Sequence, residues 1–196
     1  MANMGFDLLW IKIDVQARAP RRGARSNLSL HSTPDLAKQA AASTPPCGRR
    51  SSGSGLPSFR WLGPEPYADF ADRNVLTIII IEEKRAVEKI DEIASTPGID
   101  VLFIGANDLS YSYGKRGNQE DPEVKEAIAK VLAAGKKYGV PVGRPSGSAE
   151  QMAQFVKAGF QFIQGPSDLN MLGGGAAPLL KALGKEGIDP KKAPLY

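Results

Sequence analysis

The sequence predicts an α/β fold built around a parallel β-sheet, and two observations lead to this prediction. From residue 67 onward, short apolar segments rich in β-formers alternate with segments whose apolar residues recur at the helical period. Their order is β, α, β, α, β, α, β, α, which is the pattern of half a (β/α)8 barrel. At 196 residues the chain has room for one sizeable core, so we expect a single domain over residues 1–196.

The repeated elements can be assigned from apolar runs and breaks. The strands are expected at residues 78–81, 99–105, 140–143 and 160–165. Apolar residues that recur at the helical period between 86 and 94 predict one helix after the first of these strands. The Gly-rich stretch 166–175 is interpreted as a loop that leads into a last helix, from Ala176 to about Leu183.

Three polar residues are predicted to cap helices at their starts. Thr33 precedes Pro34 and a short alanine-rich segment, and Asp121 likewise precedes a proline and a long amphipathic segment. Ser148 with Gln151 forms a capping-box pattern. These signals define where the helices between the predicted strands begin.

Residues 1–66 follow the alternating pattern less clearly and are interpreted as a basic N-terminal part. Residues 5–14 form an apolar run that we expect to be a strand, whereas residues 27–30 fit either a short strand or a loop. Residues 45–66 are rich in Pro, Gly, Ser and Arg, which fits a flexible surface loop or an active-site loop. Residues 67–196 then form the clearer half-barrel.

The net charge of +4 is unevenly distributed, with +6 on residues 1–60 and −2 on residues 61–196. The arginines of the basic part lack interleaved aromatic residues and match no recognised binding module, which disfavours nucleic acid as a partner.

A mitochondrial targeting segment at residues 15–31 is an alternative to a cytoplasmic location. The single cysteine, Cys47, excludes an internal disulfide framework and favours a reducing, intracellular compartment. No apolar run approaches the roughly 20 residues that span a bilayer.

A carboxylate stands just past the end of each of two consecutive predicted strands: Glu82 and Asp108. Adjacent parallel strands lie about 4.8 Å apart, so both side chains can reach one small cation. Oxygen ligands without nearby Cys or His favour Mg²⁺ or Mn²⁺. The turn that begins at Asn107 also offers backbone N–H groups suited to a substrate carboxylate. Two interpretations stay open, because Glu82 can also be a first-turn helix acid and Asp108 a capping residue.

The residues around this pair resemble a known family. Ile81-Glu82, the following helix and the run GIDVLFIGANDLS are similar to the signature of the HpcH/HpaI aldolase and citrate lyase family, typically V-Q-x-E and then G-I-D-x-x-F-I-G-P-x-D-L-S. The similarity continues through DPEVKEAIAKVLAAGKKYGVPVG and GFQFIQGPSDLNML, at the family's seventh and eighth strands. Upstream, STPDLAKQAAASTPPCGRRS and GFDLLWI resemble segments at the fourth and second strands. The resemblance therefore covers most of the chain.

The resemblance implies a (β/α)8 TIM-type barrel of the phosphoenolpyruvate/pyruvate kind. It also implies reversible, metal-dependent cleavage of a 4-hydroxy-2-oxo acid to pyruvate and an aldehyde. Glu82 and Asp108 match the family's two protein ligands of Mg²⁺ or Mn²⁺. The backbone at Ala106, Asn107 and Asp108 matches the segment that holds the pyruvate carboxylate, and Arg18 is the nearest candidate for the substrate-gripping arginine. Homo-oligomers whose C-terminal helices pack across subunits are expected on the same basis.

The chain departs from the family pattern in its first third. The family's second strand ends in an I-D-x-E-H motif whose His supports acid–base chemistry, but residues 11–17 read IKIDVQA and only His31 is present, so no catalytic base is assigned. Ile80 replaces the glutamine that precedes the metal-binding glutamate. A complete barrel has about 250 residues, and matches to the first strand and to the helices flanking the third are missing. The alternatives are therefore a catalytically impaired or inactive barrel remnant acting only by association, or an incomplete gene model.

Overall fold

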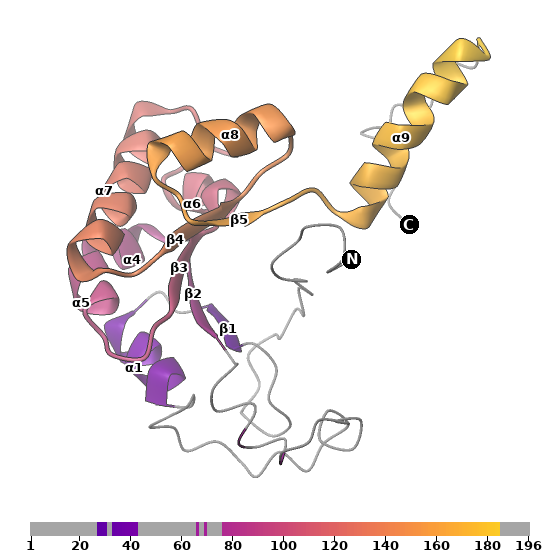
Figure 1. The fold of residues 1–196 in the computed structure, drawn as a ribbon. Helices are drawn as coiled ribbons and strands as arrows, with labels where there is room; N and C mark the ends of the chain where they lie inside the picture. Colours follow the sequence, from indigo (N-terminus) through magenta and orange to yellow (C-terminus); the bar gives the residue numbers. More distant parts are fainter. Residues whose placement is uncertain (1–26, 31–32, 43–65, 67–68, 70–75, 185–196) are drawn as a thin grey trace.

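A parallel β-sheet is the centre of the computed structural model, which describes residues 27–30, 33–42, 66, 69 and 76–184 (Figure 1). In these residues the sheet has five strands: β1 (Asn27–Leu30), β2 (Thr77–Ile81), β3 (Val101–Ile104), β4 (Val142–Pro145) and β5 (Phe162–Gln164). Their spatial order is the same as their order in the chain, and each neighbouring pair is parallel. The predicted α/β class and parallel sheet are therefore confirmed, and residues 27–30 are a strand rather than a loop.

Helices follow the strands and lie along the left and top of the sheet in Figure 1. They are α1 (Pro34–Ala42), α4 (Lys84–Glu88), α5 (Ile90–Ala94), α6 (Ala106–Ser112), α7 (Pro122–Tyr138), α8 (Ala149–Ala158) and α9 (Asp168–Ala182). All except α9, which stands away from the sheet, cover the same side, as expected when each helix returns the chain to the start of the next parallel strand. Among the described helices, none combines the length and the apolar character needed to cross a membrane.

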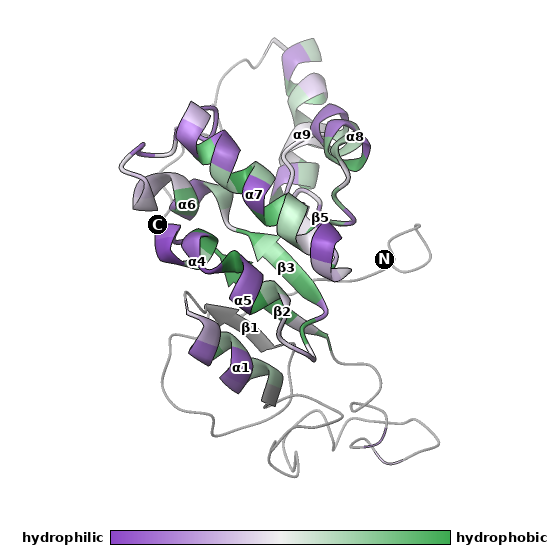
Figure 2. Cartoon of the chain, turned by 90° about the vertical axis from the view of Figure 1, so that its left-hand side faces the viewer, coloured by the Kyte–Doolittle hydropathy of each residue, from purple (hydrophilic) through white to green (hydrophobic). Residues whose placement is uncertain are grey.

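The central strands β2 and β3 are buried on both faces. One set of side chains, Ile79, Ile81, Leu102, Ile104 and Val142, belongs to the large apolar cluster that includes the helices. The alternate set, Ile78, Ile80, Val101 and Phe103, forms a second cluster on the opposite face, where the rings of Phe103 and Phe162 meet edge to face at 6.1 Å. Figure 2 shows the resulting hydrophobic colour along β2 and β3. Burial on both faces explains why the sequence there is an uninterrupted apolar run rather than an alternating one.

The three predicted helix caps are confirmed by side-chain hydrogen bonds. The backbone N–H groups of Leu36, Glu123 and Gln151 donate to Thr33 Oγ1 (3.4 Å), Asp121 Oδ1 (3.0 Å) and Ser148 Oγ (3.2 Å), respectively. Each bond satisfies a first-turn donor that has no partner within its own helix. The starts of α1, α7 and α8 are thus determined by local sequence.

The helix predicted after β2 is interrupted. Lys89, with φ −106° and ψ 19°, separates α4 from α5. The predicted apolar period nevertheless survives, because its members on both sides of the break, Ala86, Val87, Ile90, Ile93 and Ala94, are all buried. The prediction of one continuous helix was therefore wrong, whereas the predicted buried face is confirmed.

The predicted loop at residues 166–175 is also wrong, because α9 begins at Asp168. Ser167 is its N-cap and accepts a hydrogen bond from Asn170 N at 3.2 Å, and Asp168 supplies a favourable first-turn acid. Three successive glycines, residues 173–175, cost about 1 kcal/mol each relative to alanine in a helix interior, which is why they favour a loop in a sequence-based prediction. The start of the helix is set by the cap that precedes them.

Gly135 of α7 lies directly against the end of the loop before β4 and against β4 itself. A Cβ atom there would meet Val142 Cγ2 and, at 2.7 Å, the backbone oxygen of Val140. We expect Gly135→Ala to lower the free energy of unfolding by about 1–3 kcal/mol. This overpacking outweighs the roughly 1 kcal/mol by which alanine favours a helix interior.

Urea denaturation measures this effect, and Gly174→Ala is the matched control. Gly174 also lies inside a helix, but a Cβ atom there meets nothing within 4 Å. The control variant should therefore be as stable as the parent or more stable. A Gly135→Ala protein that unfolds at the same urea concentration as Gly174→Ala would contradict the close packing of α7 on β4.

Candidate metal and substrate site

Glu82 and Asp108 follow adjacent strands at the same edge of the sheet. β2 and β3 pair in parallel, with Ile81 opposite Ile104. The next residues to leave the two strands are Glu82 and Gly105, and Gly105 N donates a hydrogen bond to Ile81 O at 3.1 Å. This is the carboxyl edge, where open and closed parallel sheets bind their ligands.

The absence of a side chain at Gly105 leaves space for Glu82. A Cβ atom at Gly105 would lie 3.1 Å from Glu82 Cβ and 3.2 Å from Glu82 Oε2. Such separations are shorter than the roughly 3.5–4.0 Å optimum between non-bonded heavy atoms. The half-buried Glu82 carboxylate therefore lies against the backbone that starts α6.

Asp108 is an exposed residue in the first turn of α6, and its helix face is turned toward the segment that follows Glu82. Residues four apart lie on the same face of a helix, which places Ser112 one turn beyond Asp108. Ser112 Oγ accepts a hydrogen bond of 2.8 Å from Lys84 N, the first residue of α4. The face of α6 that carries Asp108 therefore borders Lys84, two residues beyond Glu82.

The start of α6 presents backbone N–H groups at this edge. The amides of Ala106, Asn107 and Asp108 belong to the first turn, where a helix supplies no carbonyl acceptor of its own. The N-cap residue is Gly105, which has no side chain to accept from them. Ala106 is 1% exposed, so only its backbone can serve a ligand, while Asn107 and Asp108 are exposed. Charge complementarity at such a helix start favours an anion.

The loop after α6 folds back onto that helix. Ser110 is fully buried, and its hydroxyl donates to Asn107 O (2.6 Å) and accepts from Gly117 N (2.8 Å). Lys115 forms ion pairs with Glu123 and with the cap residue Asp121 at 3.4 Å, and the hydrogen bond to Glu123 raises the pKa of Lys115. The loop is thus attached to α6 at one end and to the start of α7 at the other.

A half-buried cation on β4, Arg144, supports the same loop. Arg144 donates from Nη2 to Gln119 Oε1 at 3.1 Å, and its guanidinium lies 4.1 Å from the ring centre of Phe155 and 5.7 Å from that of Phe160. Burial lowers the pKa of Arg144, although Glu120 acts in the opposite direction. By strand alternation Arg144 is on the same face as Val142, the helix-facing side, which fits a role in anchoring the loop.

Several residues predicted from the sequence lie outside the described residues. These are Arg18, the predicted substrate-gripping residue, and His31, together with the predicted strand at residues 5–14 and the loop at residues 45–66. Sequence analysis did not single out Ser110 and Ser112. The sequence offers little reason to select these two serines, because a serine in a helix usually bonds only to a carbonyl of its own preceding turn.

The carboxylate pair fits an ion that keeps part of its water shell. Within the described part of the chain, no group of three or more His, Cys, Asp or Glu side chains is arranged to hold a metal. Mg²⁺ is commonly bound through one or two carboxylates, with water and substrate oxygens in the remaining positions. Two oxygen ligands at an edge that also offers backbone donors therefore suit a site that the substrate completes.

Comparison with known proteins identifies the group to which the chain is related. The model of the HpcH/HpaI aldolase/citrate lyase family matches residues 10–173. A hydroxypyruvate/pyruvate aldolase of Sagittula stellata is 37% identical over 142 residues, which are 71% of this chain and 56% of that protein. A 5-keto-4-deoxy-D-glucarate aldolase of Klebsiella pneumoniae is 32% identical, with 78% of this chain and 60% of that protein covered.

Solved structures support the same relationship. The crystal structure of an HpcH/HpaI aldolase/citrate lyase family protein from Burkholderia cenocepacia matches with a TM-score of 0.69 and 33% identity, covering 78% of this chain and 62% of that one. An HpcH/HpaI aldolase from Desulfitobacterium hafniense gives a TM-score of 0.66 at 26% identity. The predicted class, an incomplete (β/α)8 barrel, is confirmed, and the chain spans less than two thirds of the length of each of these proteins.

Proposed function

Because the chain belongs to the HpcH/HpaI aldolase/citrate lyase family, we propose that it is a metal-dependent carbon–carbon lyase. The proposed reaction is reversible aldol cleavage of a 4-hydroxy-2-oxo acid to pyruvate and an aldehyde. The observation that carries the proposal is the position of two carboxylates past neighbouring strands, beside the first turn of α6. The single Cys47 supports a reducing compartment, and we propose the cytoplasm as its location.

In this proposal, Glu82 and Asp108 hold one divalent cation, Mg²⁺ or Mn²⁺. When bound, the cation would polarise the keto group of a 2-oxo acid and stabilise the negative charge that develops as the carbon–carbon bond breaks. Glu82 is the more constrained of the two carboxylates, because Gly105 lies against it. The bond between Lys84 N and Ser112 Oγ, one turn from Asp108, supports placing Asp108 on the same side of the edge as Glu82.

The amides of Ala106, Asn107 and Asp108 are proposed to bind the substrate carboxylate. They belong to the first turn of α6, where N–H groups and the partial positive charge of a helix start favour an anion. Arg18 is proposed as a second contact for the same carboxylate. With its carboxylate fixed there, a 2-oxo acid would present its keto oxygen toward the cation that the two acidic side chains would hold, which is the orientation that cleavage requires.

A titration with Mn²⁺ tests the two carboxylates. We expect Glu82→Gln and Asp108→Asn each to weaken Mn²⁺ binding at least about tenfold, because each removes a charged oxygen ligand. Isothermal titration calorimetry on the purified chain measures the dissociation constants. Glu126→Gln, which removes an exposed acid from α7, is the control and should bind as the parent does. Equal affinity in Asp108→Asn and Glu126→Gln would disprove the metal assignment.

A turnover assay separates the lyase from a second candidate function. The chain spans 56% of the first relative described above and lacks the histidine of the second-strand motif, which favours a catalytically inactive barrel remnant acting only by association. We expect pyruvate release from a 4-hydroxy-2-oxo acid, followed by coupled reduction of the pyruvate, to require Mg²⁺ or Mn²⁺ and to stop when the metal is chelated. The absence of pyruvate release at saturating metal would instead favour the remnant.

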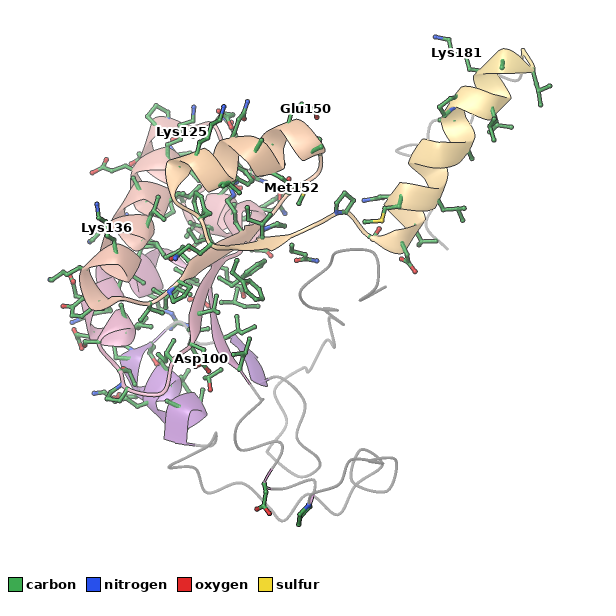
Figure 3. All side chains as sticks on the ribbon, in the orientation of Figure 1. Asp100, Lys125, Lys136, Glu150, Met152 and Lys181 are labelled. Atoms are coloured by element: carbon green, nitrogen blue, oxygen red, sulfur yellow. The ribbon has the colours of Figure 1, made fainter. Side chains whose placement is uncertain are left out.

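Self-association is proposed through α9. Figure 1 shows this helix standing away from the sheet, and Figure 3 shows Lys181 near its far end. Its large apolar side chains are exposed: Leu169 73%, Leu172 72%, Leu179 69%, Leu180 47% and Leu183, just beyond the helix, 71%. Exposed apolar surface of this kind marks an interaction site. A homo-oligomer in which α9 packs on another copy of the chain would cover it.

Introducing a charge into α9 tests this arrangement. We expect Leu172→Glu to shift the chain toward the monomer in sedimentation velocity experiments, because a carboxylate cannot be buried unpaired at an apolar contact. Val156→Glu on α8 is the matched control, since Val156 is also an exposed apolar side chain, at 61%, but lies on a different helix. An unchanged sedimentation profile of Leu172→Glu would rule out α9 as the contact.

A further inference from the structure

Two serines of α6 use their hydroxyl groups to connect this helix with other segments. Ser110 and Ser112 lie two residues apart, one fully buried and the other exposed. A serine inside a helix commonly bonds only to a carbonyl of the preceding turn. Ser95, the C-cap residue of α5, makes a local bond of this kind, donating to Glu92 O at 3.2 Å. Ser110 and Ser112 differ from it because each accepts a hydrogen bond from a backbone N–H outside α6.

Ser112 caps a helix that it does not belong to. Its Oγ accepts from Lys84 N at 2.8 Å, across 28 residues of sequence. Lys84 is the first residue of α4, so its N–H has no carbonyl acceptor within that helix. The N-cap residue of α4, Glu83, makes no side-chain capping bond. The cap therefore comes from α6, whose position beside the start of α4 can be followed in Figure 2.

This bond joins the two segments that carry the carboxylates. On one side, Lys84 is two residues beyond Glu82, so fixing its N–H fixes the path of the chain that leaves β2. On the other side, Ser112 is one helical turn from Asp108 on the same face of α6. The Ser112–Lys84 bond therefore ties the chain that leaves β2 after Glu82 to the helix that carries Asp108.

Ser110 connects the first turn of α6 to the loop that follows this helix. Its hydroxyl donates to Asn107 O at 2.6 Å and accepts from Gly117 N at 2.8 Å, so both its donor and an acceptor position are used. Gly117 has φ +89°, a conformation that glycine adopts readily, and its position brings it close to the Asn107 side chain. Lys115 N also donates to Ser110 O at 2.8 Å. The turn that carries Asn107 and Asp108 is thereby fastened to the following loop.

We infer that Ser110 and Ser112 are positioning residues for the metal site, with Ser112 fixing Glu82 relative to Asp108 and Ser110 fixing the turn that bears Asp108. The inference rests on the proposed function, because it assigns the two serines a role toward the cation that Glu82 and Asp108 hold. Neither serine contacts the cation in this scheme. Both act on its carboxylate ligands through the backbone, as outer groups that orient metal ligands do.

Mn²⁺ affinity of the 196-residue chain, measured by isothermal titration calorimetry without substrate, tests the inference. We expect Ser112→Ala to bind Mn²⁺ about 10- to 100-fold more weakly than the parent, which is the usual cost of losing an orienting group. Ser112→Thr keeps a hydroxyl at the same position and should restore most of the affinity. Ser95→Ala removes the exposed C-cap serine of α5, whose hydroxyl bonds only to the adjoining turn, and is the matched control.

Ser110→Ala is a second variant with the same expected direction. Because Ser110 is buried, its replacement can also disturb folding. Ser112 is exposed and caps α4, so Ser112→Ala should lose no more thermal stability than Ser148→Ala, which removes the exposed N-cap hydroxyl of α8, and should still lose Mn²⁺ affinity. A loss of Mn²⁺ affinity without an equivalent loss of thermal stability is not expected of a hydroxyl whose role is only structural.

The outcomes distinguish the inference from the function beneath it. If the parent binds Mn²⁺ and Ser112→Ala binds it equally well, the positioning role is overturned while the metal site stands. Equal losses in Ser112→Ala and Ser95→Ala would also overturn it, because the effect would then not be specific to α6. A parent chain that does not bind Mn²⁺ would refute the metal assignment itself, and the inference with it.

Discussion

The parallel pairing of β2 with β3 is the constraint on which the rest of the site depends. With Ile81 opposite Ile104, Glu82 and Gly105 leave the sheet side by side, and α6 begins next to a carboxylate. A shift of this register by one residue would turn every buried side chain of a strand to the opposite face. Since both faces of β2 are packed, with Ile79 and Ile81 on one and Ile78 and Ile80 on the other, the core itself holds the register.

Three glycines allow neighbouring segments to pack closely around the β2–β3 pair. At Gly105 the missing side chain admits Glu82, at Gly143 it admits the backbone and ring of Phe162 on β5, and at Gly135 it lets α7 lie against Val142. In each place a β-carbon would force a strand, a helix or a functional side chain outward. The close packing of β4 on β5, of α7 on β4 and of Glu82 on the start of α6 therefore depends in each case on a glycine, which has no Cβ atom.

The local signals of the sequence account for much of the fold. Caps at Thr33, Asp121 and Ser148 act over three residues or fewer, and their hydrogen bonds are present as predicted. They also explain one failure, since the glycines of α9 favoured a loop while the cap at Ser167, just before them, starts a helix. Local preference gave the wrong boundary there because two local signals disagreed.

By itself, the sequence determined the class of fold, the caps and the two acids past consecutive strands, because periodicity and capping involve only near neighbours in the chain. It left open whether those acids share a site or serve as ordinary helix residues. The tertiary structure decided which residues stand beside them: Gly105 against Glu82, Lys84 bonded to Ser112, and Gly117 bonded to Ser110. These contacts join segments up to 28 residues apart, and they exist only once the strands have paired in one register.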